Sequence, residues 1–409
     1  MILFFKLFIL FIKFKLVKIM KYLRYYISTL TLLVGIYLCL AVQSGPTILF
    51  LGFSLLIILG DILISEEDSE FQYSHPFFLN LPMYVNLPLL VLFLFMTIIL
   101  LAENTIGDRI IYEYLNINLS KVKESFYFYD KVSLVAISSL FIGIMGTVPG
   151  HELVHRKTRK FDMFMGNWLL SLSWDCAFAL EHVYGHHKNV GLRIDPATAK
   201  RGENIYAFIF RAIVKEQKDA WNIFLNQKNK NKSSFISIKN KMLIGYLRSL
   251  FITLFAFLIG GFEGAMIFLL CAFIAKSLLE VINYTEHYGL VRVPGEKVRP
   301  HHSWNSNSVM SSIYLYNVTR HSSHHEKSSL KYWELRPYKG APMMPYGYLS
   351  MLYLAIFLPI VFHRLMSKKL VEWDNKFASK NERLLAVEQN LSSGIPFLQK
   401  KSQSLDMGI

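Results

Sequence analysis

The sequence predicts an all-α integral-membrane fold, a bundle of six membrane-spanning helices with a histidine-rich site on its cytoplasmic side. First, the 409 residues are 53% hydrophobic and only 18% charged, and the mean hydropathy is +0.33. This composition excludes disordered and collagen-like chains and argues against a water-soluble protein. Second, the apolar residues fall in blocks of about 17 to 20, the length of a membrane span. Third, 11 of the 13 histidines lie between His151 and His325.

Six blocks have the length and composition of membrane spans, because each reaches across about 30 Å of hydrocarbon at 1.5 Å per residue. The predicted spans are 26–43, 46–64, 87–103, 132–150, 245–262 and 264–282. Turn-forming residues join the first pair at Ser44-Gly45-Pro46 and the last pair at Gly260-Gly261. A further apolar run, 161–180, contains Asp162 and Asp175, so we expect a half-inserted or surface hairpin there rather than a crossing.

The two ends of the chain differ from this central part. Residues 1–25 are apolar with interspersed lysines, which fits an interfacial amphipathic helix or a translation start at Met20. The absence of a small-residue cleavage site argues against a cleaved signal peptide. Residues 26–340 form the predicted catalytic domain. Residues 341–409 combine a Pro-interrupted apolar segment, expected at the membrane interface, with a basic tail.

Loop charge predicts the orientation of the spans. The net charge is +15, and 12 Lys or Arg residues lie in the segment 183–244. By the positive-inside rule this segment and the basic tail are cytoplasmic. Six spans then place the N-terminus in the cytoplasm as well, and the histidine clusters reach that same face. Nucleic-acid binding is disfavoured because the basic loops lack interleaved aromatic residues.

Three cysteines, Cys39, Cys176 and Cys271, lie in apolar stretches and form no C-x-x-C pair. A disulfide framework or a zinc ribbon is therefore not expected. An iron site built from four thiolates is excluded, and we expect buried, inert thiols.

The first histidine cluster is His151-Glu152-Leu153-Val154-His155. Its i, i+4 spacing places two imidazoles on one helix face. The pattern also matches the H-E-x-x-H of zinc peptidases. Such a site needs one further protein ligand, however, and a structural zinc needs four ligands in all, whereas many more histidines remain here.

The other clusters are Glu181-His182-Val183-Tyr184-Gly185-His186-His187 and His321-Ser322-Ser323-His324-His325, with a single His287 between them. Together the four groups offer nine imidazoles. Two metal ions with four or five nitrogens each would use all nine, although imidazole alone does not distinguish iron from zinc, copper or nickel.

At these residues the sequence resembles the membrane alkane 1-monooxygenases, a branch of the integral-membrane fatty acid desaturase and hydroxylase superfamily. The resemblance runs from about the second span to Arg336. Its most specific element is NYTEHYGL at 283–290, and DPATA at 195–199, HSWNSN at 302–307 and RHSSHH at 320–325 are also similar to that branch. The chain departs from the usual pattern at Val318-Thr319, at Glu326 and at Tyr332-Trp333. These departures spare the histidines, but the family's substrate range and redox-partner docking do not carry over directly to this chain.

The resemblance implies two iron ions, molecular oxygen as the oxidant, and rubredoxin with its reductase as the electron source. It also implies nine metal ligands: His151, His155, His182, His186, His187, His287, His321, His324 and His325. The expected substrate is an alkane that dissolves in the bilayer. A ligating histidine usually donates its other N–H to a carboxylate or carbonyl group, so Glu152, Glu181, Glu286 and Asp195 are candidates to orient the rings.

Several alternatives remain at this stage. In the same superfamily the chain could hydroxylate the methyl group of an alkylaromatic compound such as xylene, or act as a fatty acyl hydroxylase or desaturase. In other classes it could be a metallopeptidase or a metal-binding membrane protein without catalysis.

Overall fold

The computed structural model describes residues 20–103, 105–106, 112–114, 118–231 and 240–406. Residues 1–19, and with them most of the expected N-terminal segment, lie outside this part. The described chain is helical, and its one β-bridge joins Asn305 to Met343. The apolar N-terminal half contributes η1 (Arg24–Tyr26), α2 (Ile27–Ala41), α3 (Gly45–Leu63), α4 (Pro76–Leu101), α6 (Leu119–Glu124), α7 (Phe128–Phe141), η2 (Ile142–Thr147) and α8 (Val148–Val154).

The remaining helices carry the other histidines and the tail. They are α9 (Lys160–Ser171), α10 (Phe178–Glu181), η3 (His182–His186), α11 (His187–Asn189), α12 (Ile205–Asn231), α13 (Lys241–His287), η4 (Pro300–His302), α14 (Val309–Tyr314), α15 (His321–Glu326), η5 (Tyr332–Glu334), α16 (Tyr348–Phe357), α17 (Pro359–Lys376), α18 (Lys380–Ser392) and α19 (Pro396–Asp406).

Five helices of the described chain are long and apolar enough to cross a membrane: Met20–Ala41, Gly45–Leu63, Pro76–Leu101, Phe128–Val154 and Lys241–His287. The expectation of an all-helical chain with several long apolar helices is confirmed. The two last predicted spans fall within the single 47-residue element α13. The Pro-rich α4 begins earlier than predicted, at Pro76.

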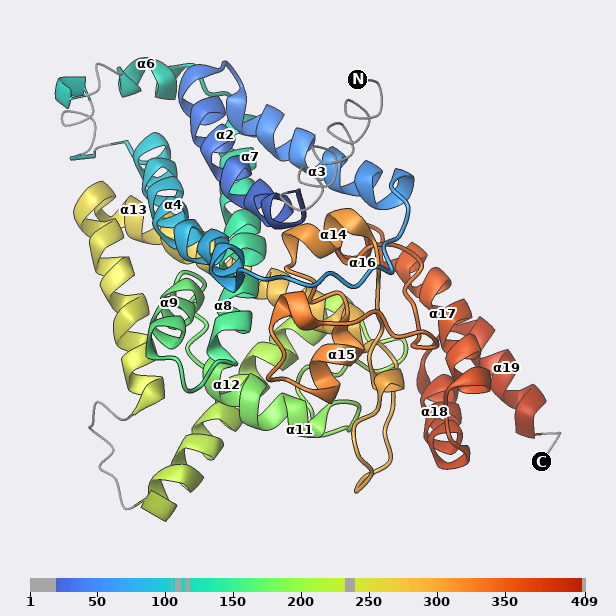
Figure 1. Cartoon of the computed structure of the whole chain (residues 1–409). Coiled ribbons are helices and arrows are strands. Elements are labelled where there is room, and N and C mark those ends of the chain that lie inside the picture. The colour runs from blue at the N-terminus through green and yellow to red at the C-terminus, as the bar shows by residue number, and fades with distance from the viewer. Residues whose placement is uncertain (1–19, 104, 107–111, 115–117, 232–239, 407–409) are drawn as a thin grey trace, which may run out of the picture.

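The element α13 is not one straight helix. Gly260 and Gly261 leave the helical conformation, and Gly261 has φ 60° and ψ −152°, a backbone shape that glycine adopts readily. The arms on either side come close together, since a Cβ atom on Gly264 would lie 2.5 Å from the carbonyl oxygen of Ala256. The chain therefore bends sharply at the glycine pair predicted to join two spans (Figure 1).

The segment 161–180 forms α9, a turn and the short α10. Its two acidic residues are buried and paired. Asp162 accepts hydrogen bonds from Tyr84 and Arg156, and Asp175 pairs with Lys276. The Asp162 contacts hold α9 against α4 and the end of α8, and the Asp175 pair holds the following turn against α13.

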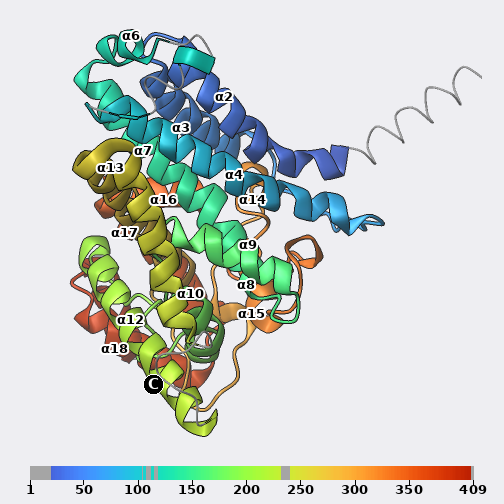
Figure 2. The same ribbon diagram turned by 90° about the vertical axis from the view of Figure 1, so that its left-hand side faces the viewer.

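The elements that carry the histidine clusters, α8, η3, α11 and α15, lie towards the end of the bundle away from α6 (Figures 1 and 2). The tail helices α17 to α19 pack beside this end. The short apolar helix α16 contacts α3 and α13, and its Tyr348, Leu349 and Leu352 are buried.

Candidate metal centre

The first cluster lies on α8 and its C-cap, and α8 continues α7 through the π-helical segment η2. The i, i+4 spacing brings the rings of His151 and His155 within 4.9 Å of each other. The Nε2 atom of His151 lies 3.0 Å from the Nε2 atom of His324 on α15. Residues 173 positions apart in the sequence therefore meet at one point.

The second cluster is divided by a π-helical turn. In the segment His182–His186, backbone hydrogen bonds join residues five apart, so His182 and His187 lie on nearly the same face. Their Nε2 atoms are 3.2 Å apart. His186 points elsewhere, with its Nε2 atom 3.2 Å from that of His325.

The third cluster is divided by ordinary α-helical geometry. The Nε2 atoms of His321 and His325, one turn apart on α15, are separated by 2.9 Å. His321 Nε2 also lies 3.1 Å from Nε2 of His287, at the end of α13. His324, on another face of α15, joins the group around His151.

The nine histidines thus form two groups of potential metal ligands. One contains His151, His155, His182, His187 and His324; the other contains His186, His287, His321 and His325. Within each group the candidate ligand atoms lie within 4.8 Å of one another. The sequence predicted two sites of four or five nitrogens each, and the structure separates the histidines in that way.

Both groups have properties that suit a metal ion. Two nitrogens bound to one metal at about 2.1 Å, at right angles, would be roughly 3 Å apart, close to the separations of 2.9 to 3.2 Å observed here. The buried Nε2 atom of His155 has no hydrogen-bond partner among the described residues. Such an orphaned lone pair is costly unless an ion or water binds it.

Burial keeps the rings outside the apolar helices neutral. Burial, assisted by neighbouring rings, lowers the pKa of His182, His187 and His325 well below the usual value. It lowers the pKa of His324 to about 3. A metal ligand must be the neutral imidazole, so these rings are in the form that binds metal.

Two of the four candidate acids contact candidate ligands. Asp195 places both carboxylate oxygens within 3.1 Å of the Nδ1 atom of His186, and Glu286 lies 3.3 Å from Nε2 of His321. The Asp195 carboxyl is buried, which by itself would raise its pKa, but His186 and Thr198 lower the pKa below the usual value.

The other two acids differ from the prediction. Glu152 points to Arg156, which donates from Nε and Nη2 at 3.1 and 2.6 Å. Glu181 has a buried Oε1 atom without a hydrogen-bond partner among the described residues. An acid that is next to a histidine in the sequence need not contact its ring, because neighbouring residues on a helix point in different directions.

His301 and His302, left without a role by the sequence, hold the tail helix α18. Both Nε2 atoms approach Oε1 of Glu382, at 3.2 and 2.6 Å. The backbone N–H of Arg299 donates to Nδ1 of His302, so the ring hydrogen is on Nε2 and Glu382 accepts it. These three side chains could also hold a metal by geometry, but the hydrogen bonds already occupy both nitrogens of His302.

The HSWNSN segment fixes α15. The side chain of Asn305 accepts from the backbone N–H of Ser322 at 2.9 Å. The backbone N–H of Trp304 donates to the carbonyl group of Glu286 at 2.9 Å. This segment therefore connects the third histidine cluster to the end of α13, next to His287.

A buried charged cluster lies elsewhere along α13. Lys276 Nζ lies 2.9 Å from Asp175, 2.7 Å from Glu216 and 2.6 Å from Glu280. All four residues are buried. The cluster joins α13 to α12 and to the turn before α10, so it helps to position the second histidine cluster. Only its i, i+4 pair, Lys276 with Glu280, is local in the sequence.

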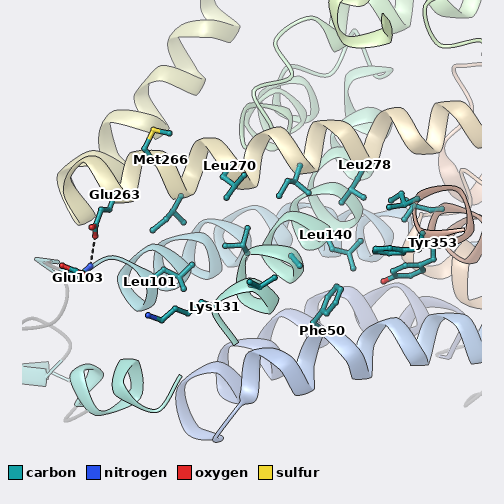
Figure 3. A pocket seen from close by; sticks show the side chains of 18 residues that line it. Phe50, Leu101, Glu103, Lys131, Leu140, Glu263, Met266, Leu270, Leu278 and Tyr353 are labelled. Atoms are coloured by element: carbon teal, nitrogen blue, oxygen red, sulfur yellow. Dashed lines mark hydrogen bonds between the residues drawn. The ribbon is translucent and has the colours of Figure 1, made fainter. Parts of the chain in front are cut away.

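An apolar groove of about 750 Å³ runs along the helical bundle. Leu270 and Leu278 of α13, Leu140 of α7 and Tyr353 of α16 line it (Figure 3). The charged residues Glu103, Lys131 and Glu263 lie at one end. Leu278 precedes His287 by nine residues on one helix arm, a rise of roughly 14 Å.

Comparison with known proteins identifies the class of enzyme. The sequence profile described as "Fatty acid desaturase" matches residues 132–355, more than half of the chain, and this region includes all nine histidines. The chain belongs to the fatty acid desaturase family. With its buried histidine clusters it is an oxidoreductase of that family.

The curated proteins that this chain is similar to include alkane monooxygenases and a xylene/toluene monooxygenase component. Alkane 1-monooxygenase 2 of Alcanivorax borkumensis is 36% identical over 56% of this chain and 60% of its own length. Alkane 1-monooxygenase 1 of Pseudomonas aeruginosa is 37% identical over 54% of this chain and 58% of its own length. The hydroxylase component of the xylene/toluene monooxygenase of Pseudomonas putida is 30% identical over 64% and 70%. The chain thus spans about 60% of the length of the alkane monooxygenases that it matches.

Proposed function

We propose that this protein is a membrane di-iron monooxygenase that hydroxylates the terminal methyl group of an alkane. The balanced reaction combines the alkane, one O₂, two electrons and two protons to give a primary alcohol and water. The observation that carries the proposal is the division of nine histidines, all buried or half-buried, into groups of five and four. The relatives named alkane 1-monooxygenase support the choice of substrate.

The nine histidines would hold the two iron ions, with His151, His155, His182, His187 and His324 at one ion and His186, His287, His321 and His325 at the other. Bound iron would supply the oxygen chemistry that an unactivated C–H bond requires and no side chain provides. Asp195 would orient His186 through Nδ1. Glu286 approaches Nε2 of His321, the nitrogen that faces His287 and His325, so it would not orient that ring in the same way. The surrounding buried residues exclude water.

The apolar groove supports a hydrocarbon substrate. Its middle is lined by aliphatic side chains of α7 and α13, and its charged residues are confined to one end (Figure 3). We propose that alkane from the bilayer uses this groove to approach the histidines. Hydrophobic walls with few polar groups are typical of pockets for apolar ligands.

The electron donor would dock where exposed lysines surround the site. Lys157, Lys188 and Lys327 are exposed, and each follows a histidine cluster by one or two residues. We propose that this face is cytoplasmic, with both termini, and that it binds an acidic redox protein, with rubredoxin as the candidate. Within 183–244, not every basic residue is free for docking, because Arg201 is buried and pairs with Asp374.

The second candidate is methyl hydroxylation of an alkylaromatic compound, favoured by the similarity to the xylene/toluene monooxygenase component. The test is an assay of the reconstituted protein with octane, a longer alkane and xylene, each with reduced rubredoxin and O₂. The proposal predicts 1-alkanols as products. Turnover of xylene alone would favour the second candidate, and a desaturated product would contradict hydroxylation.

A further inference from the structure

A second groove, of about 550 Å³, lies between the tail helices α17 and α19, apart from the histidines. Its lining is partly basic and partly apolar. The residues are Ile360, His363, Arg364, Ser367, Lys368 and the segment 394–397. We call it the tail groove. This mixture differs from the apolar groove of Figure 3, whose walls are mainly aliphatic.

Arg364 and Lys368 provide the positive charge of the tail groove. They lie one helical turn apart, so they project on the same face of α17, and both are exposed. Neither has an ion-pair or hydrogen-bond partner among the residues that the structure describes. Two other lysines of the same helix, Lys369 and Lys376, pair with Glu372. Of the Lys and Arg residues of α17, only Arg364 and Lys368, beside the tail groove, lack an acidic partner among the described residues.

The apolar part of the tail groove is unusually accessible for a protein surface. Ile360 is 76% exposed and Phe397 is 44% exposed. Phe357 and Leu358, at the junction of α16 and α17, are 65% and 54% exposed. Contiguous exposed apolar residues mark a surface that contacts a membrane or another partner.

The tail groove begins where the apolar surface of the bundle ends. Tyr206 of α12 donates a hydrogen bond to the carbonyl oxygen of Ile356, at the end of α16. Phe210, one turn further along α12, lies with its ring 6.3 Å from that of Phe273 on the apolar helix α13. All three aromatic residues are substantially exposed. An exposed apolar and aromatic surface thus leads from α13 to the start of α17, as expected at a membrane interface.

We propose that the tail groove binds one anionic phospholipid from the surrounding bilayer. Its phosphate would lie on Arg364 and Lys368, and an acyl chain would follow Ile360, Ile395 and Phe397. The argument combines an unmatched positive pair with an apolar lining at the boundary of the bilayer, the combination that attracts anionic lipids. The inference does not depend on the proposed reaction.

Bound lipid would fix the position of the tail helices relative to the membrane surface. His363, in the groove, lies 2.5 Å from the hydroxyl oxygen of Tyr288, which follows His287. Asp374, further along α17, pairs with the buried Arg201. Helix α17 therefore links the tail groove to Tyr288, next to His287, and to Arg201.

The test is native mass spectrometry of the full-length protein in neutral detergent, titrated with phosphatidylglycerol or with phosphatidylcholine of the same acyl chains. We expect the first phosphatidylglycerol to bind about tenfold more tightly than phosphatidylcholine. The double variant Arg364→Gln/Lys368→Gln should lose this preference, and Arg364→Lys/Lys368→Arg should retain it. The matched control Lys369→Gln/Lys376→Gln, on the same helix, should also retain it.

Equal binding of the two lipids by the wild-type protein would overturn the proposal without any variant. So would a full preference in Arg364→Gln/Lys368→Gln, because the anionic lipid would then bind elsewhere. The melting temperatures of the variants, measured in the same detergent, verify that they are folded. Neither result bears on oxygenase activity, so failure here leaves the proposed function separately testable.

Discussion

Both carboxylate oxygens of Asp195 face the Nδ1 atom of His186, at 3.1 and 3.0 Å, and both side chains are buried. Thr198 donates to Asp195 from its hydroxyl group at 2.5 Å. This arrangement fixes the ring hydrogen of His186 on Nδ1, because a carboxylate can only accept. The Nε2 lone pair is then directed towards His325 and the second histidine group.

Replacing Asp195 should therefore weaken the metal site without unfolding the protein. Asp195→Asn keeps the shape but no longer enforces the tautomer, and loss of such a partner costs about 10- to 100-fold in metal affinity or activity. The measurement is iron retained per chain after dialysis against a chelator. Glu388→Gln, which removes an exposed partner of Arg193, is the control. Equal iron retention in both variants would show that Asp195 does not orient a ligand.

Lys276 should be required for stability, since it compensates three buried carboxylates. Lys276→Met leaves them unpaired, and breaking a buried ion pair typically costs about 3–5 kcal/mol. We expect a lower melting temperature in detergent. Lys369→Met, at a partly exposed pair, should change it little. An unchanged melting temperature in Lys276→Met would mean that the cluster contributes nothing to stability.

Acid should destabilise the contact between α18 and the site. Burial alone would raise the pKa of Glu382, but hydrogen bonds with His301, His302 and the backbone of Ser379 lower it well below the usual value. A carboxyl with a lowered pKa stabilises the folded state above its unfolded pKa of about 4.3. That stability is lost as the pH falls towards the folded value.

The measurement is the melting temperature from pH 7 down to about pH 3 for the wild type and for Glu382→Gln. The wild type should be more stable at pH 7, and the difference should shrink as the pH falls below about 4.3. A difference that is independent of pH would contradict an ionised Glu382 in this contact.

Electron transfer should depend on salt through the lysines around the site. Charges separated by more than about 10 Å are screened near 0.1 M salt, so the rate of reduction by rubredoxin should fall with ionic strength. The variant Lys157→Gln/Lys188→Gln/Lys327→Gln should be slower at low salt and nearly insensitive to it. Lys380→Gln, an exposed position on α18, should behave as the wild type. A salt-insensitive wild type would argue against electrostatic docking here.

Much of this architecture is readable from the sequence because its signals are local. Apolar length places the long helices, and Gly260-Gly261 marks the bend in α13. Helical spacing pairs His151 with His155 and His321 with His325. The i, i+5 relation of His182 and His187 appears in the sequence, yet only the π-helical turn shows why His186 joins the other group.

The remaining features depend on contacts between distant segments. Glu382 lies 80 residues from His302, and Glu216 lies 60 residues from Lys276, so neither pairing has a local pattern. Glu152 is expected to contact a histidine because it follows His151 in the sequence, but its carboxylate accepts a hydrogen bond from Arg156, one turn later. Tertiary packing decides which neighbour a buried acid meets.

The central claim is that nine histidines hold two iron ions. Its most direct test is metal analysis of the full-length protein purified from cells supplied with both iron and zinc, compared with His287→Ala and the control His301→Ala. We predict two irons per chain in the wild type and in His301→Ala, and about one in His287→Ala. A single zinc per chain, or two irons retained with full activity in His287→Ala, would contradict the account.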